Sequence, residues 1–216
     1  ASIFMWSMGN ECGPGKAWES AIATIKATDA TRPVHYERYN TIADVDSKMY
    51  PTVEWLFKRG ELGDGKIDDF DGSKNTKKNP TAQTKGKPFF MCEYAHAMGN
   101  AIGNFKEYWD AFYSSDSLVG GCIWDWVDQS IYDAKDIKNG NFEVDGMNKY
   151  RTGSDYPGPH QGNFCSNGVI PATRHEGAKL MEVKAAHQFV KFHLVGVNEK
   201  ENTAQVRIEN HYDFIS

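Results

Sequence analysis

The first 130 residues alternate short apolar runs with segments of helical periodicity, and this alternation restricts the possible folds more than any other feature. The apolar runs predict strands at residues 3–8, 34–36, 43–49, 89–92 and 122–126. Between them, apolar side chains recur at helical spacing and predict helices at 16–27, 53–57 and about 102–112. Strands that alternate with helices form parallel sheets covered by helices, so the sequence predicts an α/β fold.

The remainder of the chain is organised differently. Residues 128–175 are rich in Gly, Asn, Asp and Pro, and their aromatic content favours an ordered, functional loop over a disordered one. A helix is predicted at 176–187, followed by two antiparallel strands joined by a turn at 198–202. Because two strands cannot bury an apolar face alone and the chain opens directly in a strand, we expect the sequence to be a piece of a longer polypeptide.

Two glutamates stand where apolar runs stop. Glu11 closes the segment that begins at Trp6, and Glu93 closes the segment that begins at Phe89. A glutamate in such a position is often just the first solvated residue of a loop, but the polar and aromatic residues around both favour a functional role. A carboxylate at the end of a buried strand lies at the rim of the sheet, where side chains converge on a cavity. Two of them suggest acid/base chemistry.

Composition and charge exclude several functional classes. The formal charge is −5 and the pI about 5.8, whereas nucleic-acid binders usually carry a basic face. No apolar run approaches the roughly 20 residues of a membrane-spanning helix, so no membrane partner is expected. The four cysteines are widely spaced, which predicts free thiols rather than a zinc or redox site. The one basic cluster is interpreted as a solvated surface loop, and its members are Lys74, Lys77, Lys78, Lys85 and Lys87.

Five segments together resemble the β-galactosidases of glycoside hydrolase family 2, in the same order along the chain. They are Gly9-Asn10-Glu11, Met49-Tyr50, residues 92–100, residues 124–129 and residues 163–168. The resemblance covers roughly Ile3 to Phe192 and implies the C-terminal half of a (β/α)8 TIM barrel, strands four to eight, in residues 1–187. It also implies the first strands of an antiparallel β-sandwich domain in residues 188–216. Glu11 and Glu93 then follow strands four and seven, on the face where barrel enzymes carry their catalytic groups.

The resemblance further implies an activity, the hydrolysis of terminal non-reducing β-D-galactose with retention of configuration. Glu93 would be the nucleophile and Glu11 the general acid/base, with their carboxyl groups about 5 to 5.5 Å apart. Tyr50 matches a tyrosine beside the nucleophile, where its phenol can orient the carboxylate. The remaining matches are to substrate-binding positions, namely Asn10, Met49, His96, Trp124, Phe164 and Asn167.

Metal ions are implied by the same resemblance. Glu11 matches a ligand of Mg²⁺, while the Phe164 carbonyl and the Asn167 side chain match ligands of Na⁺. The other ligands of both ions would lie upstream of this sequence. Hard cations need about six oxygen ligands, so we expect complete sites only in the whole protein and partial ones here.

Several alternatives stay open. β-Glucuronidases and β-mannosidases of the family would share both glutamates, although the motifs of His96 and Trp124 resemble galactosidases. A non-catalytic carbohydrate-binding module is a second alternative. Since five strands cannot close an eight-stranded barrel, we expect little or no hydrolysis by this chain alone. The expected partners are a β-galactoside, the other domains of the polypeptide and further copies of it. The location is expected to be either the cytoplasm or the periplasm. The sequence gives no role to an insertion at 62–87.

Overall fold

The computed structural model describes residues 2–62, 86–131, 143–144, 147–148 and 151–215. Strand β1 (Trp6–Ser7) pairs in parallel with β2 (Val34–His35). Strands β3 (Asp46–Met49), β4 (Phe89–Tyr94) and β5 (Leu118–Ile123) form a parallel three-stranded sheet in that order. A parallel bridge between His35 and Val45 connects the two sheets, so the strands follow one another in sequence order. The predicted α/β fold is therefore confirmed.

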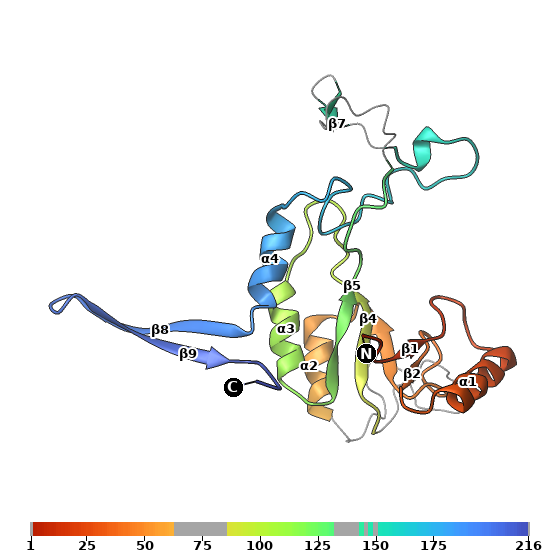
Figure 1. The fold of residues 1–216 in the computed structure, drawn as a ribbon, viewed down its shortest axis with the longest axis horizontal. Helices are drawn as coiled ribbons and strands as arrows, with labels where there is room; N and C mark the ends of the chain where they lie inside the picture. The colour runs from red at the N-terminus through yellow and green to blue at the C-terminus, as the bar shows by residue number, and fades with distance from the viewer. Residues whose placement is uncertain (1, 63–85, 132–142, 145–146, 149–150, 216) are drawn as a thin grey trace.

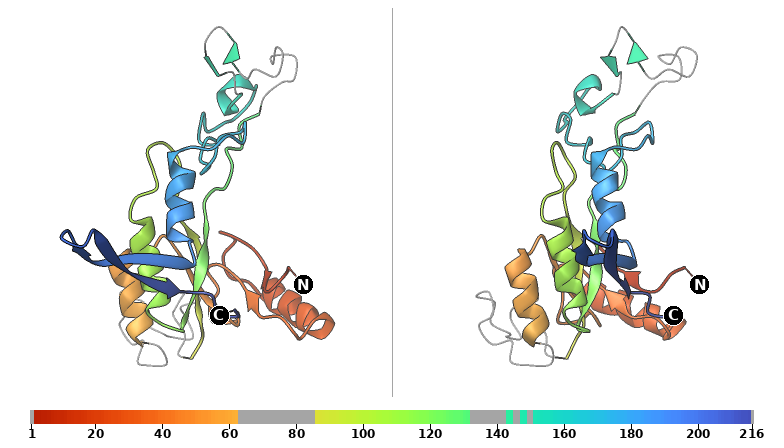
Figure 2. Two further views of the ribbon diagram at one scale, coloured as in Figure 1. Left: turned by 60° about the vertical axis from the view of Figure 1, so that its left-hand side comes forward. Right: turned by 90° about the vertical axis from the view of Figure 1, so that its left-hand side faces the viewer.

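Helices connect the strands as the periodicity predicted. Helix α1 (Lys16–Thr28) follows β1, α2 (Val53–Leu62) follows β3, and α3 (Phe105–Tyr113) follows β4. Helix α2 is longer than the predicted 53–57. Figures 1 and 2 show α2 and α3 together on one side of the β3–β5 sheet. This arrangement leaves the carboxyl ends of the strands and the loops that follow them to form a common rim.

The core lies between this sheet and its helices. Tyr94 of β4 is 1% exposed and its ring contacts three aromatic rings of α3, those of Phe105, Tyr108 and Phe112, at centroid distances of 5.5 to 5.8 Å. Helix α4 (Ala178–Ala186) adds Val183 to the same cluster. The buried strand β4 is thus fixed from one side by aromatic packing, which holds its C-terminal end in place.

The prediction for β5 was wrong by several residues. The strand spans Leu118–Ile123 rather than 122–126, and it contains the two glycines that were interpreted as the connection before it. A Cβ atom on Gly121 would lie 2.6 Å from the carbonyl oxygen of Met91 in β4, so only glycine permits this approach. Trp124 consequently lies just beyond the strand.

Residues 86–131 also correct the interpretation of the basic cluster. Lys87 does not belong to a solvated loop, because its Nζ donates to the carbonyl oxygens of Asn40 and Ala43 at 2.7 and 2.6 Å. Burial lowers the pKa of Lys87, with the nearby carboxylates of Asp46 and Asp44 opposing that shift. The other lysines of the cluster, and most of the 62–87 segment, lie outside the described residues.

The predicted long loop after β5 contains short elements of its own. These are β6 (Glu143–Val144), paired with β7 (Met147–Asn148), and a 3₁₀ helix, η3 (Gly153–Asp155). Thr152 and Asp155 form a capping box on η3. Much of residues 128–150 lies outside the described residues, so the order of the whole loop stays a prediction.

The two C-terminal strands form the predicted antiparallel pair. Strands β8 (Val190–Asn198) and β9 (Thr203–Asn210) make a hairpin that projects from the body beside α3 and α4 (Figure 1). The hairpin starts close to the predicted boundary at 188, while its assignment to a β-sandwich domain stays a prediction. Within the described ranges, no helix combines the length and hydropathy needed to span a bilayer. All four cysteines are free, as predicted.

The buried His35 is expected to make the β1–β2 pair sensitive to acid. Its side chain is 3% exposed, its Nδ1 lies 2.9 Å from the Ser7 hydroxyl, and burial lowers its pKa from 6.5 to about 4. Between pH 4 and 6.5 His35 is protonated to a greater extent in the unfolded state than in the folded state. The free energy of unfolding should therefore decrease as the pH falls from about 6.5 to 4. The full shift corresponds to about 3 kcal/mol. We expect hydrogen exchange of the β1 and β2 amides, corrected for the intrinsic rate, to lose protection over this range in the wild type.

The His35→Gln variant is the matched control, because its side chain does not titrate there. It should show protection that is independent of pH between 4 and 6.5. Equal loss of protection in both proteins would mean that another group controls this pair of strands.

Candidate active site

The best-defined part of the site joins the ends of β3 and β4. Glu93 is the penultimate residue of β4, and in the parallel register it pairs with Met49, the last residue of β3. Tyr50 follows Met49 with a left-handed backbone, φ 48°. Its N–H donates to the Glu93 carbonyl oxygen at 2.9 Å, and its hydroxyl donates to Oε1 of the Glu93 carboxylate at 2.5 Å. Two bonds therefore fix the phenol against the carboxylate.

The phenol of Tyr50 is held in its protonated form. Tyr50 is 42% exposed, and its partial burial raises its pKa most, followed by the hydrogen bond to Glu93 and then the charges of Glu93, Cys92 and Glu11. A phenol with a raised pKa remains a hydrogen-bond donor throughout the neutral range.

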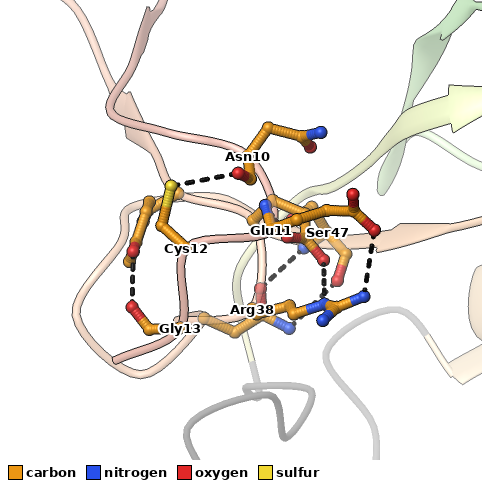
Figure 3. A network of polar contacts seen from close by, with 9 residues as sticks. Asn10, Glu11, Cys12, Gly13, Arg38 and Ser47 are labelled. Atoms are coloured by element: carbon orange, nitrogen blue, oxygen red, sulfur yellow. Dashed lines mark hydrogen bonds and ion pairs between the residues drawn. The ribbon is translucent and has the colours of Figure 1, made fainter. Parts of the chain in front are cut away.

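Glu11 lies in the loop after β1 rather than at the strand end where it was predicted. It stands four residues beyond Ser7, the last residue of β1, because the regular pairing with β2 stops early. Its backbone is left-handed, φ 54°, a conformation that costs a non-glycine residue about 1–2 kcal/mol. The Glu11 side chain is 57% exposed, and its Oε1 lies 3.3 Å from the guanidinium of Arg38 (Figure 3).

Two residues near Glu11 were missed by the sequence analysis. Glu37 accepts the backbone N–H of Glu11 at 2.7 Å, and Arg38 donates to Glu37 and contacts the Glu11 carboxylate. Both follow the apolar run that forms β2. The criterion that selected Glu11 and Glu93, a charged residue where an apolar run stops, also fits Glu37 and could have identified it.

The aromatic residues named from the motifs lie close to the Tyr50–Glu93 pair. The His96 ring is 6.2 Å from the Tyr50 ring and 5.4 Å from the Phe164 ring, centroid to centroid. Trp124 is tied to the end of β4, because its N–H donates to the Tyr94 carbonyl and its own carbonyl accepts the N–H of Ala97. The structure thus gathers residues of three loops around the end of β4.

The other predicted site residues are placed less tightly. Met49 is half-buried within the β3–β4 register, whereas Asn10 is exposed and its carbonyl accepts the Cys12 thiol. Asn167 is 2% exposed, and its Nδ2 donates to the Phe164 carbonyl oxygen at 3.0 Å. The separation of the Glu11 and Glu93 carboxyl groups stays a prediction.

The predicted metal ligands can be compared with the donor groups present. In the described part of the chain, no three His, Cys, Asp or Glu residues are grouped so that they could hold a metal. The amide Oδ1 of Asn167 is a buried acceptor that has no hydrogen-bond partner. Together with the adjacent Phe164 carbonyl, it offers oxygen atoms of the kind that hard cations prefer. The Phe164 carbonyl accepts the Asn167 Nδ2 in this structure, so the amide presents its NH₂ group to that carbonyl. A Na⁺ site that uses both oxygens, and a Mg²⁺ site at Glu11, stay predictions.

A family model and several known proteins match most of the chain. Residues 1–192 match the family described as "Glycosyl hydrolases family 2, TIM barrel domain". "Beta-galactosidase 2" of Enterobacter cloacae is 37% identical over 91% of this chain and 18% of its own length. The "Beta-galactosidase" of Actinobacillus pleuropneumoniae is 34% identical over 99% of this chain and 18% of its own length. This chain therefore spans about 18% of the length of these relatives.

One solved structure also aligns with most of the chain. It is the GH2 β-galacturonidase of Eisenbergiella tayi bound to galacturonate, with a TM-score of 0.48 and 18% identity over 86% of this chain and 33% of that chain.

Proposed function

The chain belongs to glycosyl hydrolase family 2, and on this basis we propose that it carries the catalytic residues of a retaining β-galactosidase. One observation supports the proposal most strongly, the 2.5 Å hydrogen bond from the Tyr50 hydroxyl to the Glu93 carboxylate at the carboxyl ends of adjacent parallel strands. In this proposal β1 to β5 are strands four to eight of the barrel. The carboxylate then faces the side on which barrel enzymes bind substrates.

In the first step, the Glu93 carboxylate attacks the anomeric carbon of galactose while the bond to the leaving oxygen breaks. Glu11 gives its proton to that oxygen. Since Tyr50 holds Oε1, we assign the attack to Oε2 of Glu93. In the second step, Glu11 takes a proton from water, the water oxygen bonds to the anomeric carbon, and the ester bond to Glu93 breaks. The configuration at the anomeric carbon is retained because it is inverted twice.

The substrate is proposed to be a β-galactoside. The names of the relatives support this choice, as do His96, whose ring lies 6.2 Å from that of Tyr50, and Trp124, whose backbone bonds to Tyr94 and Ala97. His96 would bind sugar hydroxyls and Trp124 would stack on the apolar face of galactose. Asn10 would donate to the 2-hydroxyl, and Met49 and Phe164 would line the sugar site.

Two cations are proposed for the whole protein. The Glu11 carboxylate would hold Mg²⁺ together with residues outside this chain, and the Phe164 carbonyl and Asn167 side chain would contribute to a Na⁺ site. When bound, such ions supply positive charge beside the acid/base and the sugar hydroxyls. Because the chain spans about 18% of its relatives' length, the rest of the polypeptide and further copies of it are proposed as partners.

The proposal predicts selective hydrolysis. We expect the full-length gene product to cleave 4-nitrophenyl β-galactoside at least 100-fold more efficiently than the matching β-glucuronide and β-mannoside, because polar contacts to the ring substituents discriminate strongly between sugars. The measurement is kcat/KM for the three substrates. Preference for the glucuronide or mannoside would preserve the mechanism and change the substrate. Binding of galactosides without cleavage of any of them would favour a carbohydrate-binding module instead.

A further inference from the structure

Glu37 is a buried carboxylate that the proposed mechanism does not use. It follows β2, is 4% exposed, and engages both of its oxygens. Its Oε2 accepts the backbone N–H of Glu11 at 2.7 Å, and its Oε1 accepts Nε of Arg38 at 3.0 Å. A buried carboxylate needs such donors, because burial without them is costly. Glu37 therefore connects the loop after β1 to the loop after β2.

Arg38 closes this connection into a ring. One guanidinium nitrogen lies 3.3 Å from Oε1 of Glu11, and Figure 3 shows the two side chains pointing toward each other. The ring runs from the Glu11 backbone through Glu37 and Arg38 back to the Glu11 carboxylate. Glu37 thus fixes the same residue at its backbone and, through Arg38, at its side chain.

The backbone of this ring needs external support. Glu11 and Arg38 have φ angles of 54° and 66°, in the left-handed region that non-glycine residues rarely adopt. Such conformations persist where surrounding contacts hold them, and they occur preferentially at functional sites. Glu37 provides a contact to each of these two residues. The exposed Arg38–Glu11 ion pair orients the Glu11 side chain but adds little stability. The buried Glu37 is therefore the residue that holds this backbone conformation.

We propose that Glu37 is the positioning residue for Glu11, and that it acts through the Glu11 backbone and through Arg38. The proposal rests on the assignment of Glu11 as the acid/base. Misplacing a catalytic group by about 1 Å can cost roughly 100-fold in rate. Because the two Glu37 oxygens are engaged by the Glu11 N–H and by Arg38, its loss should affect proton transfer by Glu11 and leave the attack by Glu93 intact.

Proton transfer can be separated from attack by changing the leaving group. The methoxy group of a methyl glycoside needs a proton from the general acid in order to leave as methanol. The 2,4-dinitrophenyl group leaves as the phenolate anion and needs no proton. We expect Glu37→Gln in the full-length protein to lower kcat/KM for methyl β-galactoside roughly 10- to 100-fold, and for 2,4-dinitrophenyl β-galactoside by less than about 3-fold. A purely structural role would lower both values equally, and that outcome would overturn the proposal.

Two further variants make the test decisive. Glu19→Gln is the matched control, since Glu19 is exposed on α1 and accepts the Tyr39 hydroxyl, and both substrates should be cleaved as by the wild type. Arg38→Met covers the case in which Glu37→Gln does not fold, because Arg38 is exposed; it should show the same dependence on leaving group, and a uniform loss would again overturn the proposal. If the wild type cleaves neither galactoside, the proposed function itself has failed.

Discussion

Replacing Glu93 with glutamine is expected to lower kcat for β-galactoside hydrolysis by roughly 10⁴- to 10⁶-fold, the range seen when a covalent nucleophile is removed. Glutamine has nearly the same shape, and its amide oxygen can still accept the Tyr50 hydroxyl that now bonds to Glu93 Oε1. Packing at the end of β4 should therefore be preserved. The loss would come from chemistry, since an amide is a poor nucleophile toward the anomeric carbon.

The control for this variant is Glu107→Gln, which makes the same chemical change on the exposed surface of α3. Both proteins should unfold at the wild-type temperature, and only Glu93→Gln should lose activity. An enzyme cannot keep near wild-type activity after it has lost its covalent nucleophile. Activity of Glu93→Gln within about tenfold of the wild type would therefore place the nucleophile elsewhere.

Replacing Glu11 with glutamine should produce a different pattern of loss. We expect kcat/KM to fall roughly 10²- to 10⁴-fold for methyl β-galactoside, the usual contribution of general acid catalysis, and far less for the 2,4-dinitrophenyl compound. Release of the sugar from Glu93 should also become slow, since no base activates the water. Azide needs no base, so added azide should restore turnover and form β-galactosyl azide.

This product distinguishes the two glutamates. Azide attacks a galactosyl group that is already bound to Glu93, so Glu93→Gln should form no β-galactosyl azide under the same conditions. A Glu11→Gln enzyme that is not rescued by azide, with equal losses on both leaving groups, would assign Glu11 a structural role. The presence or absence of β-galactosyl azide distinguishes the two variants whatever their absolute rates of hydrolysis are.

The fold was predictable where local patterns decide the structure. Helix α1 begins at Lys16 as its apolar spacing predicted, because periodicity reports directly which face is buried. Strand β1 is much shorter than its apolar run, since Ile3 and Phe4 are 49% and 68% exposed and do not join the sheet. Strand β5 was misplaced because two glycines can mark a turn or a close approach between strands. The close approach is evident only from the Met91 carbonyl of the neighbouring strand, which lies 30 positions earlier in the sequence.

The site was predictable to a similar extent. The motifs placed Tyr50 beside Glu93, and the structure shows the hydrogen bond between them. The partners of Glu11 were not found, because they depend on left-handed bends at Glu11 and Arg38 that bring together residues 26 and 27 positions apart. No periodicity encodes such bends in residues other than glycine.

Trapping the covalent intermediate tests the central assignment most directly. A 2-deoxy-2-fluoro-β-galactoside with a good leaving group slows both steps, so the galactosyl ester should accumulate and can be located by peptide mass spectrometry. We predict one added 2-fluorogalactosyl group per chain of the full-length protein, carried by Glu93 and absent in Glu93→Gln. A label on any other residue, or turnover with inversion and no label, would contradict the assignment of Glu93 as nucleophile.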